Sequence, residues 1–234
     1  MQEADIHTKV QSERSTPAFG NTVLCAVPSV ELFCGDCIAV MKTFADKSFD
    51  ITVTDPPYNV GYKYNSHDDE MENYMEWCSD WLFECERLTK GIVAISCGTV
   101  NIGMWHNIKK PTWVAAWHKP ATMGRCPLGF NNWEPILIYG KPVKQSVDVI
   151  KAVIKPDESI NFHPCPKPLN LAAMQLHHFS NEGGAVLDPF SGSGTTMLAA
   201  YQQKFSFTGI EKDEQYYEKS INRFKQATKQ LRLF

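Results

Sequence analysis

Two strand-ending motifs, placed in an unusual order, constrain this 234-residue chain more than any other feature. The earlier motif, Asp55-Pro56-Pro57-Tyr58, directly follows an apolar run at residues 49–54. The later motif, residues 188–196 (Asp-Pro-Phe-Ser-Gly-Ser-Gly-Thr-Thr), directly follows the apolar residues 185–187. In an open parallel α/β sheet, ligands bind in the crevice outside the carboxyl ends of the strands. We therefore expect the two motifs to meet in one pocket.

The spacing of apolar residues predicts strands that alternate with helices. Short apolar runs at residues 30–34, 92–96 and 205–210 indicate strands, and residues 71–88 carry one long helical stripe. Such alternation is the signature of a doubly wound sheet. The length suits a single compact domain, so we expect one α/β domain over residues 29–234.

Two segments depart from this regular pattern. Residues 1–28 carry charge, Ser, Thr and two prolines, which predicts a flexible N-terminal arm. Residues 141–162 show no clear periodicity and contain four lysines. We interpret them as a short insert that could take part in recognising a ligand.

Composition restricts the class of protein. The net charge of −3 gives no overall sign of a polyanionic partner, so nucleic-acid binding must depend on local basic patches. No apolar run reaches the roughly 18 to 20 residues of a membrane span, and residues 1–15 lack an apolar signal core. We therefore expect a cytoplasmic protein, with no membrane contact and with reduced thiols. The pair Cys34 and Cys37 has no partner pair at zinc-site spacing, so no metal is predicted.

The later motif has the features of a cofactor-binding loop. Gly192 and Gly194 stand between a buried strand and a helix-forming run, where glycine lets the backbone approach a ligand closely. Glu211 ends the next strand, at the place where an acidic residue accepts hydrogen bonds from ribose hydroxyls. Thr195 replaces the lysine of a nucleotide phosphate loop, and Met197 replaces the third glycine of the dinucleotide fingerprint. The alternative is a purely structural tight turn.

The earlier motif is suited to hold an aromatic amine. The prolines present Tyr58 rigidly, and its ring suits stacking on an unpaired base. Asp55 and the carbonyl of Pro56 are acceptors for the two hydrogens of an exocyclic amine, which would draw its nitrogen toward a pyramidal, nucleophilic form. Orientation and activation of this kind are the catalytic task for so weak a nucleophile. The alternative is an Asp-Pro turn that merely closes a strand.

Together these residues resemble the S-adenosylmethionine-dependent amino-methyltransferases of DNA. The tetrapeptide is similar to the family's catalytic motif, residues 188–196 to its cofactor motif, and residues 163–168 (His-Pro-Cys-Pro-Lys-Pro) to the segment preceding it. The order of the motifs resembles the circularly permuted beta group, over roughly residues 30–225. The resemblance implies a Rossmann-like, doubly wound, mostly parallel sheet with one antiparallel strand. It also implies that the strands before Asp55 and Asp188 are neighbours.

The resemblance implies a role for individual residues. Asp36 would contact the cofactor adenine, Phe190 would lie near the same ring, and Glu211 would hold the ribose. The catalytic group would be Asp55, Pro56, Pro57 and Tyr58. The methionine end of S-adenosylmethionine would be framed by Asp188, Ser191, Gly192, Gly194 and Thr195, with His163 and Lys167 nearby.

The implied reaction is direct methyl transfer to the N6 amine of adenine in duplex DNA, with the target base flipped out of the helix. In the family, Asp at the first position of the tetrapeptide is usual for adenine N6, whereas Ser is commoner for cytosine N4. No metal and no covalent enzyme intermediate are required. The alternatives are cytosine-N4 methylation of DNA, adenine-N6 methylation of RNA, and a catalytically idle nucleic-acid-binding protein.

Target recognition is where the chain departs from the family pattern. The family's recognition region normally falls at residues 141–162, and about 22 residues leave little surface for reading bases. Lysines of this insert, with Lys109, Lys110, Lys119 and Arg125, could contact phosphates, which position a protein without specifying a sequence. Recognition could also be shared with residues 62–69 or with a second subunit in a homodimer.

Overall fold

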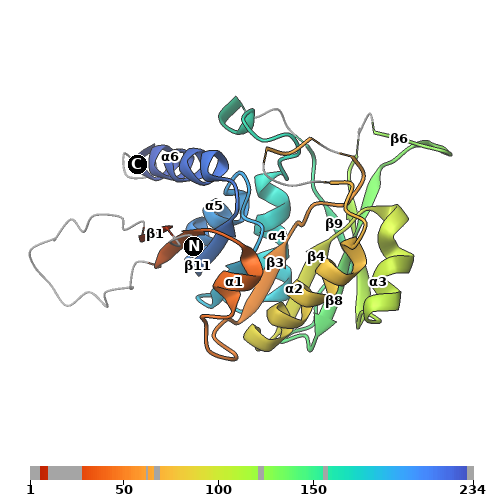
Figure 1. Ribbon diagram of the computed structural model, residues 1–234, viewed down its shortest axis with the longest axis horizontal. Coiled ribbons are helices and arrows are strands. Elements are labelled where there is room, and N and C mark those ends of the chain that lie inside the picture. Colours follow the sequence, from red (N-terminus) through yellow and green to blue (C-terminus); the bar gives the residue numbers. More distant parts are fainter. Residues whose placement is uncertain are drawn as a thin grey trace, which may run out of the picture.

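A nine-stranded sheet forms the centre of the described chain (Figure 1). The computed structural model describes residues 6–9, 28–61, 63–65, 69–120, 124–154 and 158–230. The strands lie in the order β1 (Ile6–Lys9), β2 (Val30–Cys34), β11 (Ser206–Glu211), β10 (Ala185–Asp188), β3 (Ile51–Thr54), β4 (Ile92–Ser96), β8 (Trp133–Gly140), β5 (Trp113–His118) and β9 (Val149–Lys151).

Most neighbouring strands in this sheet are parallel. The exceptions are β8, which is antiparallel to both β4 and β5, and β1, which is antiparallel to β2. The expected doubly wound, mostly parallel sheet is therefore confirmed, with β8 antiparallel in its interior and β1 antiparallel at its edge. Outside the sheet, β6 (Arg125–Cys126) and β7 (Gly129–Phe130) form a small hairpin between β5 and β8.

Helices cover both faces of the sheet (Figure 1). One face carries α1 (Cys37–Met41), α2 (Tyr74–Leu88) and α3 (Ile102–Ile108), with the 3-10 turn η1 (Thr99–Asn101) leading into α3. The other face carries α4 (Leu169–Phe179), α5 (Thr195–Gln202) and α6 (Glu214–Gln230). A second 3-10 turn, η2 (Glu158–Ile160), precedes α4. In the described chain no helix is both long enough and apolar enough to cross a bilayer.

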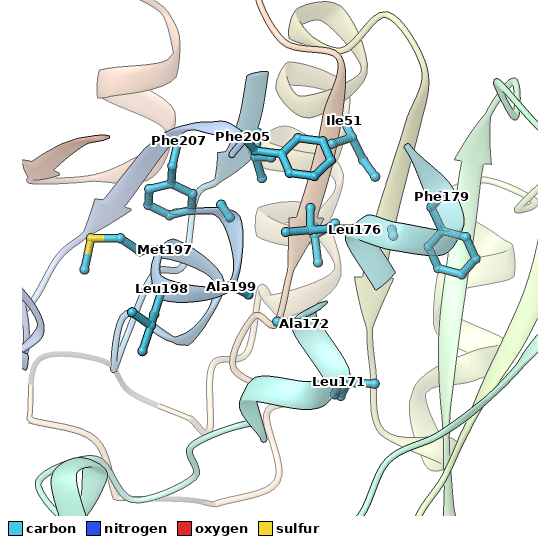
Figure 2. Close-up of a cluster of buried hydrophobic side chains, with 14 of the residues drawn as sticks. Ile51, Leu171, Ala172, Leu176, Phe179, Met197, Leu198, Ala199, Phe205 and Phe207 are labelled. Carbon is cyan, nitrogen blue, oxygen red and sulfur yellow. The ribbon is translucent and has the colours of Figure 1, made fainter. Parts of the chain in front are cut away.

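Alternation along the strands builds a separate hydrophobic core on each face. Ile136 and Ile138 of β8 belong to the core under α4, α5 and α6, whereas Leu137 and Tyr139 belong to the core under α2 and α3. Figure 2 shows part of the first core, to which Leu176 of α4 and Ile51 of β3 both belong. Because both faces are covered, the central strands β3 and β4 are buried along their whole length.

The strands that precede the two motifs are direct neighbours. Val186 of β10 pairs with Ile51 of β3, and Leu187 pairs with Thr52, in parallel register. The expectation that these strands lie side by side is confirmed. Parallel strands end at the same edge of a sheet, so this pairing carries both motifs to one edge even though the chain reaches them far apart.

The N-terminal arm needs a correction. Ile6–Lys9 form β1, so the expectation of a flexible arm over residues 1–28 is wrong for these four residues. The physical reason is that β2 would otherwise present a row of unpaired backbone groups at the edge of the sheet, and β1 covers them. Residues 1–5 and 10–27 lie outside the described residues. Within residues 141–162, the short strand β9 adds to the opposite edge, beside β5.

We expect truncation of a core aromatic to destabilise the fold. Phe207 of β11 is 1% exposed, and Phe207→Ala should lower the free energy of unfolding by about 3 to 5 kcal/mol, because it removes buried apolar contacts and leaves a cavity. Phe83→Ala is the matched control, since Phe83 is 51% exposed and its truncation should change stability by less than about 0.5 kcal/mol. Urea denaturation followed by circular dichroism measures both. Equal losses would contradict this account of the core.

Candidate functional site

A cavity of about 290 Å³ opens where β2, β3, β10 and β11 end. The earlier motif contributes Asp55 and Pro57 to its lining, and the later motif contributes Asp188, Phe190 and neighbouring loop residues. Thr54, the last residue of β3, donates its hydroxyl to Asp188 Oδ1 at 2.8 Å. The two motifs therefore border one cavity, and a buried hydrogen bond joins the ends of the strands that precede them.

The loop after β10 depends on two glycines. Gly192 and Gly194 have φ values of +49° and +75°, in the left-handed region that favours glycine. A Cβ on Gly192 would also lie 2.9 Å from Nε2 of His163, so a larger residue would clash. From α6, the buried Arg223 donates to the carbonyl of Ser193 at 3.0 Å and to Thr195 Oγ1 at 3.1 Å. Hydrogen bonds from Arg223 of α6 thus fix the conformation of the loop.

A buried carboxyl group, Asp188, and a half-buried one, Glu211, lie beside this loop. Glu211 accepts hydrogen bonds from the backbone N–H of Gly192 at 2.7 Å and of Asp213 at 2.8 Å. Burial raises the pKa of Glu211 to about 7, although these hydrogen bonds oppose the shift. Burial likewise raises the pKa of Asp188 to about 6, against the hydrogen bond from Thr54. Both groups therefore titrate near neutrality in the ligand-free protein.

Aromatic rings contribute to the lining of the cavity. Phe190 packs edgewise against Trp77 and Trp81 of α2, with ring centroids 5.5 Å and 5.0 Å apart. His163 lies against Tyr216 of α6 at 4.9 Å, and burial lowers the pKa of His163 to about 4, so its imidazole is neutral at pH 7. Such a lining suits a flat heteroaromatic ring.

The earlier motif is fixed by hydrogen bonds to its backbone. The hydroxyl of Tyr74 donates to the carbonyl of Pro57 at 2.7 Å, and the amide of Asn101 donates to the carbonyl of Tyr58 at 2.5 Å. The carboxylate of Asp69 accepts from the N–H of Asn59 at 2.8 Å, where the chain turns with a φ of 56°. These contacts from α2, η1 and the following loop set the direction of the tetrapeptide.

Neighbouring side chains use one of the two carboxylate oxygens of Asp55. Its Oδ1 accepts the hydroxyl of Tyr58 at 2.7 Å and lies 3.2 Å from Nζ of Lys167. Within the described residues, neither Oδ2 of Asp55 nor the carbonyl oxygen of Pro56 accepts a hydrogen bond. Burial raises the pKa of Asp55, opposed by Lys167 and Tyr58 and reinforced by the charge of Glu134. Two acceptors on adjacent residues therefore remain for a ligand.

The cavity includes most of the residues singled out from the sequence. Those that line it are Asp36, Asp55, Pro57, His163, Lys167, Asp188, Phe190, Ser191, Gly192, Thr195 and Glu211. Pro56, Tyr58 and Gly194 do not line it, but each adjoins a residue that does. Asp36 also caps α1, since its Oδ1 accepts the N–H groups of Ile38 and Ala39, both at 3.1 Å.

Sequence reasoning missed several lining residues and one ion pair. Tyr64, Met71, Trp77, Lys212 and Tyr216 also line the cavity. Trp77 is three residues from Tyr74 and four from Trp81, so helical spacing places all three on one face. This spacing is the sequence signal that could have identified Trp77. Lys119 is 6% exposed and its Nζ contacts Glu134 at 2.7 Å, so the expectation that it could contact phosphate is wrong. Among the described residues, no cluster of His, Cys, Asp and Glu is arranged to hold a metal.

The raised pKa of Glu211 makes a prediction about stability. A pKa near 7 in the folded protein, above about 4.3 for an unfolded glutamate, means that ionising Glu211 lowers stability as pH rises from about 4.5 to 7. Glu211→Gln removes this loss, so the Tm of the variant relative to the unchanged protein should rise between pH 5 and pH 8.

Thermal unfolding without ligand at the two pH values measures this difference. Glu218→Gln, on the exposed side of α6, is the control and should show no pH-dependent difference. A Tm difference for Glu211→Gln that stays constant with pH would contradict the assigned ionisation.

Comparisons with known proteins agree on one family. Residues 49–223 match the sequence model of the DNA methylase family of N6/N4 type. The type II methyltransferase M.HpaI of Haemophilus parainfluenzae is 28% identical, over 82% of this chain and 73% of that protein. Two solved structures share the fold: the M1.HpyAVI–SAM complex (TM-score 0.65, 22% identity, 83% of this chain and 98% of that one) and the cytosine-N4-specific PvuII DNA methyltransferase (TM-score 0.67, 16% identity, 83% and 86%).

The family match spans well over half of the chain and includes both motifs, most residues that line the cavity, and α6 up to Arg223. Strand order, motif order and cavity lining all fit a cofactor-dependent transfer to a base amine. This chain belongs to the N6/N4 DNA methylase family, the S-adenosylmethionine-dependent amino-methyltransferases of DNA.

Proposed function

We propose that this protein methylates the N6 amine of adenine in DNA, with S-adenosylmethionine as the methyl donor. The observation that carries the proposal is a pair of open acceptors on adjacent residues, Asp55 Oδ2 and the carbonyl of Pro56, of which Asp55 lines the cavity that the glycine loop and Glu211 also border. A donor held by the loop and an amine held by the acceptors would share one enclosed space.

The residues of the cavity fit this cofactor. Ser191 Oγ is buried, lines the cavity and has no hydrogen-bond partner within the described residues, so a polar ligand would satisfy it. Gly192 leaves space that a side chain would fill, and Glu211 offers carboxylate oxygens for ribose hydroxyls. Phe190 and Trp77 offer apolar ring surface for the adenine, with Asp36 at the same rim. When bound, the cofactor supplies an electrophilic methyl group on a sulfonium sulfur.

The chain's own part in the reaction is to orient the amine and accept its proton. Asp55 Oδ2 and the carbonyl of Pro56 accept its two hydrogens, which localises the nitrogen lone pair and aims it into the cavity. Methylation leaves this nitrogen with one surplus proton. The raised pKa of Asp55 makes its carboxylate a suitable acceptor for it. Tyr58, fixed through Asn101, would stack on the extruded base.

Adenine is favoured by Asp55, the residue that the family resemblance associates with adenine N6. Cytosine N4 is the second candidate, because the cytosine-specific PvuII enzyme has the same fold. The two amines need the same pair of acceptors, so the choice depends on how the ring is held.

Recognition of DNA would involve the segment between β8 and α4. Residues 141–149 are exposed and include Lys141 and Lys144, whereas Lys119 serves a buried ion pair instead. So small a surface supports contact mainly with phosphates, and we propose that a second subunit extends it on DNA in the cytoplasm. Light scattering with and without duplex DNA measures whether two copies assemble.

Mass spectrometry of nucleosides tests the proposed product. Genomic DNA from cells that express the protein should contain N6-methyladenine above the level of cells without it, and sequencing that detects modified bases gives its context. N4-methylcytosine instead would overturn the choice of base. Methyl transfer to RNA but not to a DNA of matched sequence would overturn the choice of substrate.

We expect Asp55→Ala to abolish transfer without loss of cofactor binding. Removing a preorganised acceptor for the amine should lower kcat by about 100-fold or more, while cofactor Kd stays within a few-fold. Transfer of labelled methyl to DNA and isothermal titration with the cofactor measure the two quantities. Asp46→Ala is the control, because the Asp46 side chain is 74% exposed and pairs with Arg87. An active Asp55→Ala variant would rule out the role given to Asp55.

A further inference from the structure

Four charged side chains form a cluster beside the tetrapeptide. Lys167 Nζ lies 2.8 Å from Glu134 Oε2 and 3.2 Å from Asp55 Oδ1, and Lys119 Nζ lies 2.7 Å from Glu134 Oε1. The side chains of Lys119, Glu134 and Lys167 are 7%, 16% and 13% exposed. The cluster holds two carboxylates and two ammonium groups, so its formal charge is zero.

Neutralising the charge of Asp55 requires only Lys167, and neither Glu134 nor Lys119 is needed for it. Asp55 and Lys167 alone would neutralise each other, and each additional buried charge carries a desolvation penalty of several kcal/mol. Burial opposes the charge on Glu134, but Lys167 and Lys119 outweigh it and hold its pKa below the usual value. A second buried pair next to a minimal one therefore calls for a function.

The backbone fixes Glu134 and Lys119 independently of Asp55. Glu134 belongs to β8 and pairs with Trp117 of β5, and the N–H of Lys119 donates to the carbonyl of Asn132 at 2.7 Å. The two ammonium groups lie 5.4 Å and 5.3 Å from the Trp117 ring. The indole N–H donates to the carbonyl of Ala152 at 2.9 Å, which holds that ring in place.

Because Glu134 is fixed in this way, it determines how close the Lys167 ammonium lies to each of its three partners. Its Nζ is 2.8 Å from Glu134, 2.8 Å from the hydroxyl of Tyr58 and 3.2 Å from Asp55. Lys167 is therefore closer to Glu134 than to Asp55. Without the charge on Glu134, the ammonium would be drawn to Asp55, the remaining carboxylate, and would occupy the acceptor that the base amine needs.

We propose that Glu134, supported by Lys119, is a positioning residue that restrains Lys167 from fully pairing with Asp55 and so keeps Asp55 available to the target amine. The consequence for methyl transfer rests on the proposed function. The restraint itself is a property of the cofactor-free protein and is measurable without DNA.

Carbon-13 NMR of aspartate carboxyls tests the restraint directly. In Glu134→Gln the titration midpoint of Asp55, assigned with Asp55→Asn, should fall by about one pH unit, because Lys167 moves closer and a neighbouring negative charge is lost. The other titratable groups that face Asp55 are Tyr58, Tyr64, Cys97 and Asp188, and they are the same in both proteins. An unchanged or raised midpoint would overturn the proposal.

Kinetics test the consequence. Glu134→Gln should lower kcat at least tenfold, leave cofactor Kd within twofold, and move the acidic limb of the kcat–pH profile to lower pH. Glu86→Gln, which removes a carboxylate from the Lys109 pair far along the chain from the tetrapeptide, is the control and should change none of these. Loss of kcat with an unmoved acidic limb would indicate a merely structural role and overturn the proposal.

The double variant Lys119→Met with Glu134→Gln separates positioning from charge balance. It restores neutrality to the cluster but leaves Lys167 without its restraint, so kcat should stay as low as in Glu134→Gln. Recovery of kcat would show that Glu134 only neutralises Lys119 and would overturn the proposal. If the unchanged protein methylates no DNA, the proposed function fails, while the NMR midpoint still decides the restraint.

Discussion

The parallel pairing of β3 with β10 underlies the whole site. It places the residue that ends each strand at one edge of the sheet, and the hydrogen bond from Thr54 to Asp188 joins the two ends. The cavity, its aromatic lining and the open acceptors of the tetrapeptide all lie just beyond that edge. Cores on both faces fix the pairing, because a shift of one residue would turn buried side chains to the wrong face.

Buried charge is concentrated at this edge. Burial raises the pKa of Asp55, Asp188 and Glu211, so each carboxylate is less stable here than in water. Backbone N–H groups offset part of this penalty at Glu211, and Lys167 does so at Asp55. Carboxylates of this kind favour ligands that bring hydrogen-bond donors or positive charge. An aromatic amine brings hydrogen-bond donors, and the sulfonium cofactor brings positive charge.

The sequence predicted the local elements well because the apolar patterns are strong. The strands at residues 30–34 and 92–96 have the predicted bounds, and the two motifs meet at one cavity. The features that the sequence did not predict depend on contacts between distant segments, which no local pattern of residues encodes. β1 forms because an edge strand is available to pair with it, and the burial of Lys119 depends on a carboxylate that β8 brings beside it. Glu134 lies in an ordinary strand pattern, so nothing in its neighbourhood marked it as part of the site.

The order of the motifs affects how the site comes into existence during synthesis. Thr54 and Asp188, which join the two halves of the site, are separated by 134 positions in the chain. A growing chain on the ribosome therefore presents the tetrapeptide long before the glycine loop, and Arg223, which supports that loop, emerges later still. Until α6 docks, the glycine loop lacks the support of Arg223, so the cavity cannot be complete before nearly the whole described chain has been made.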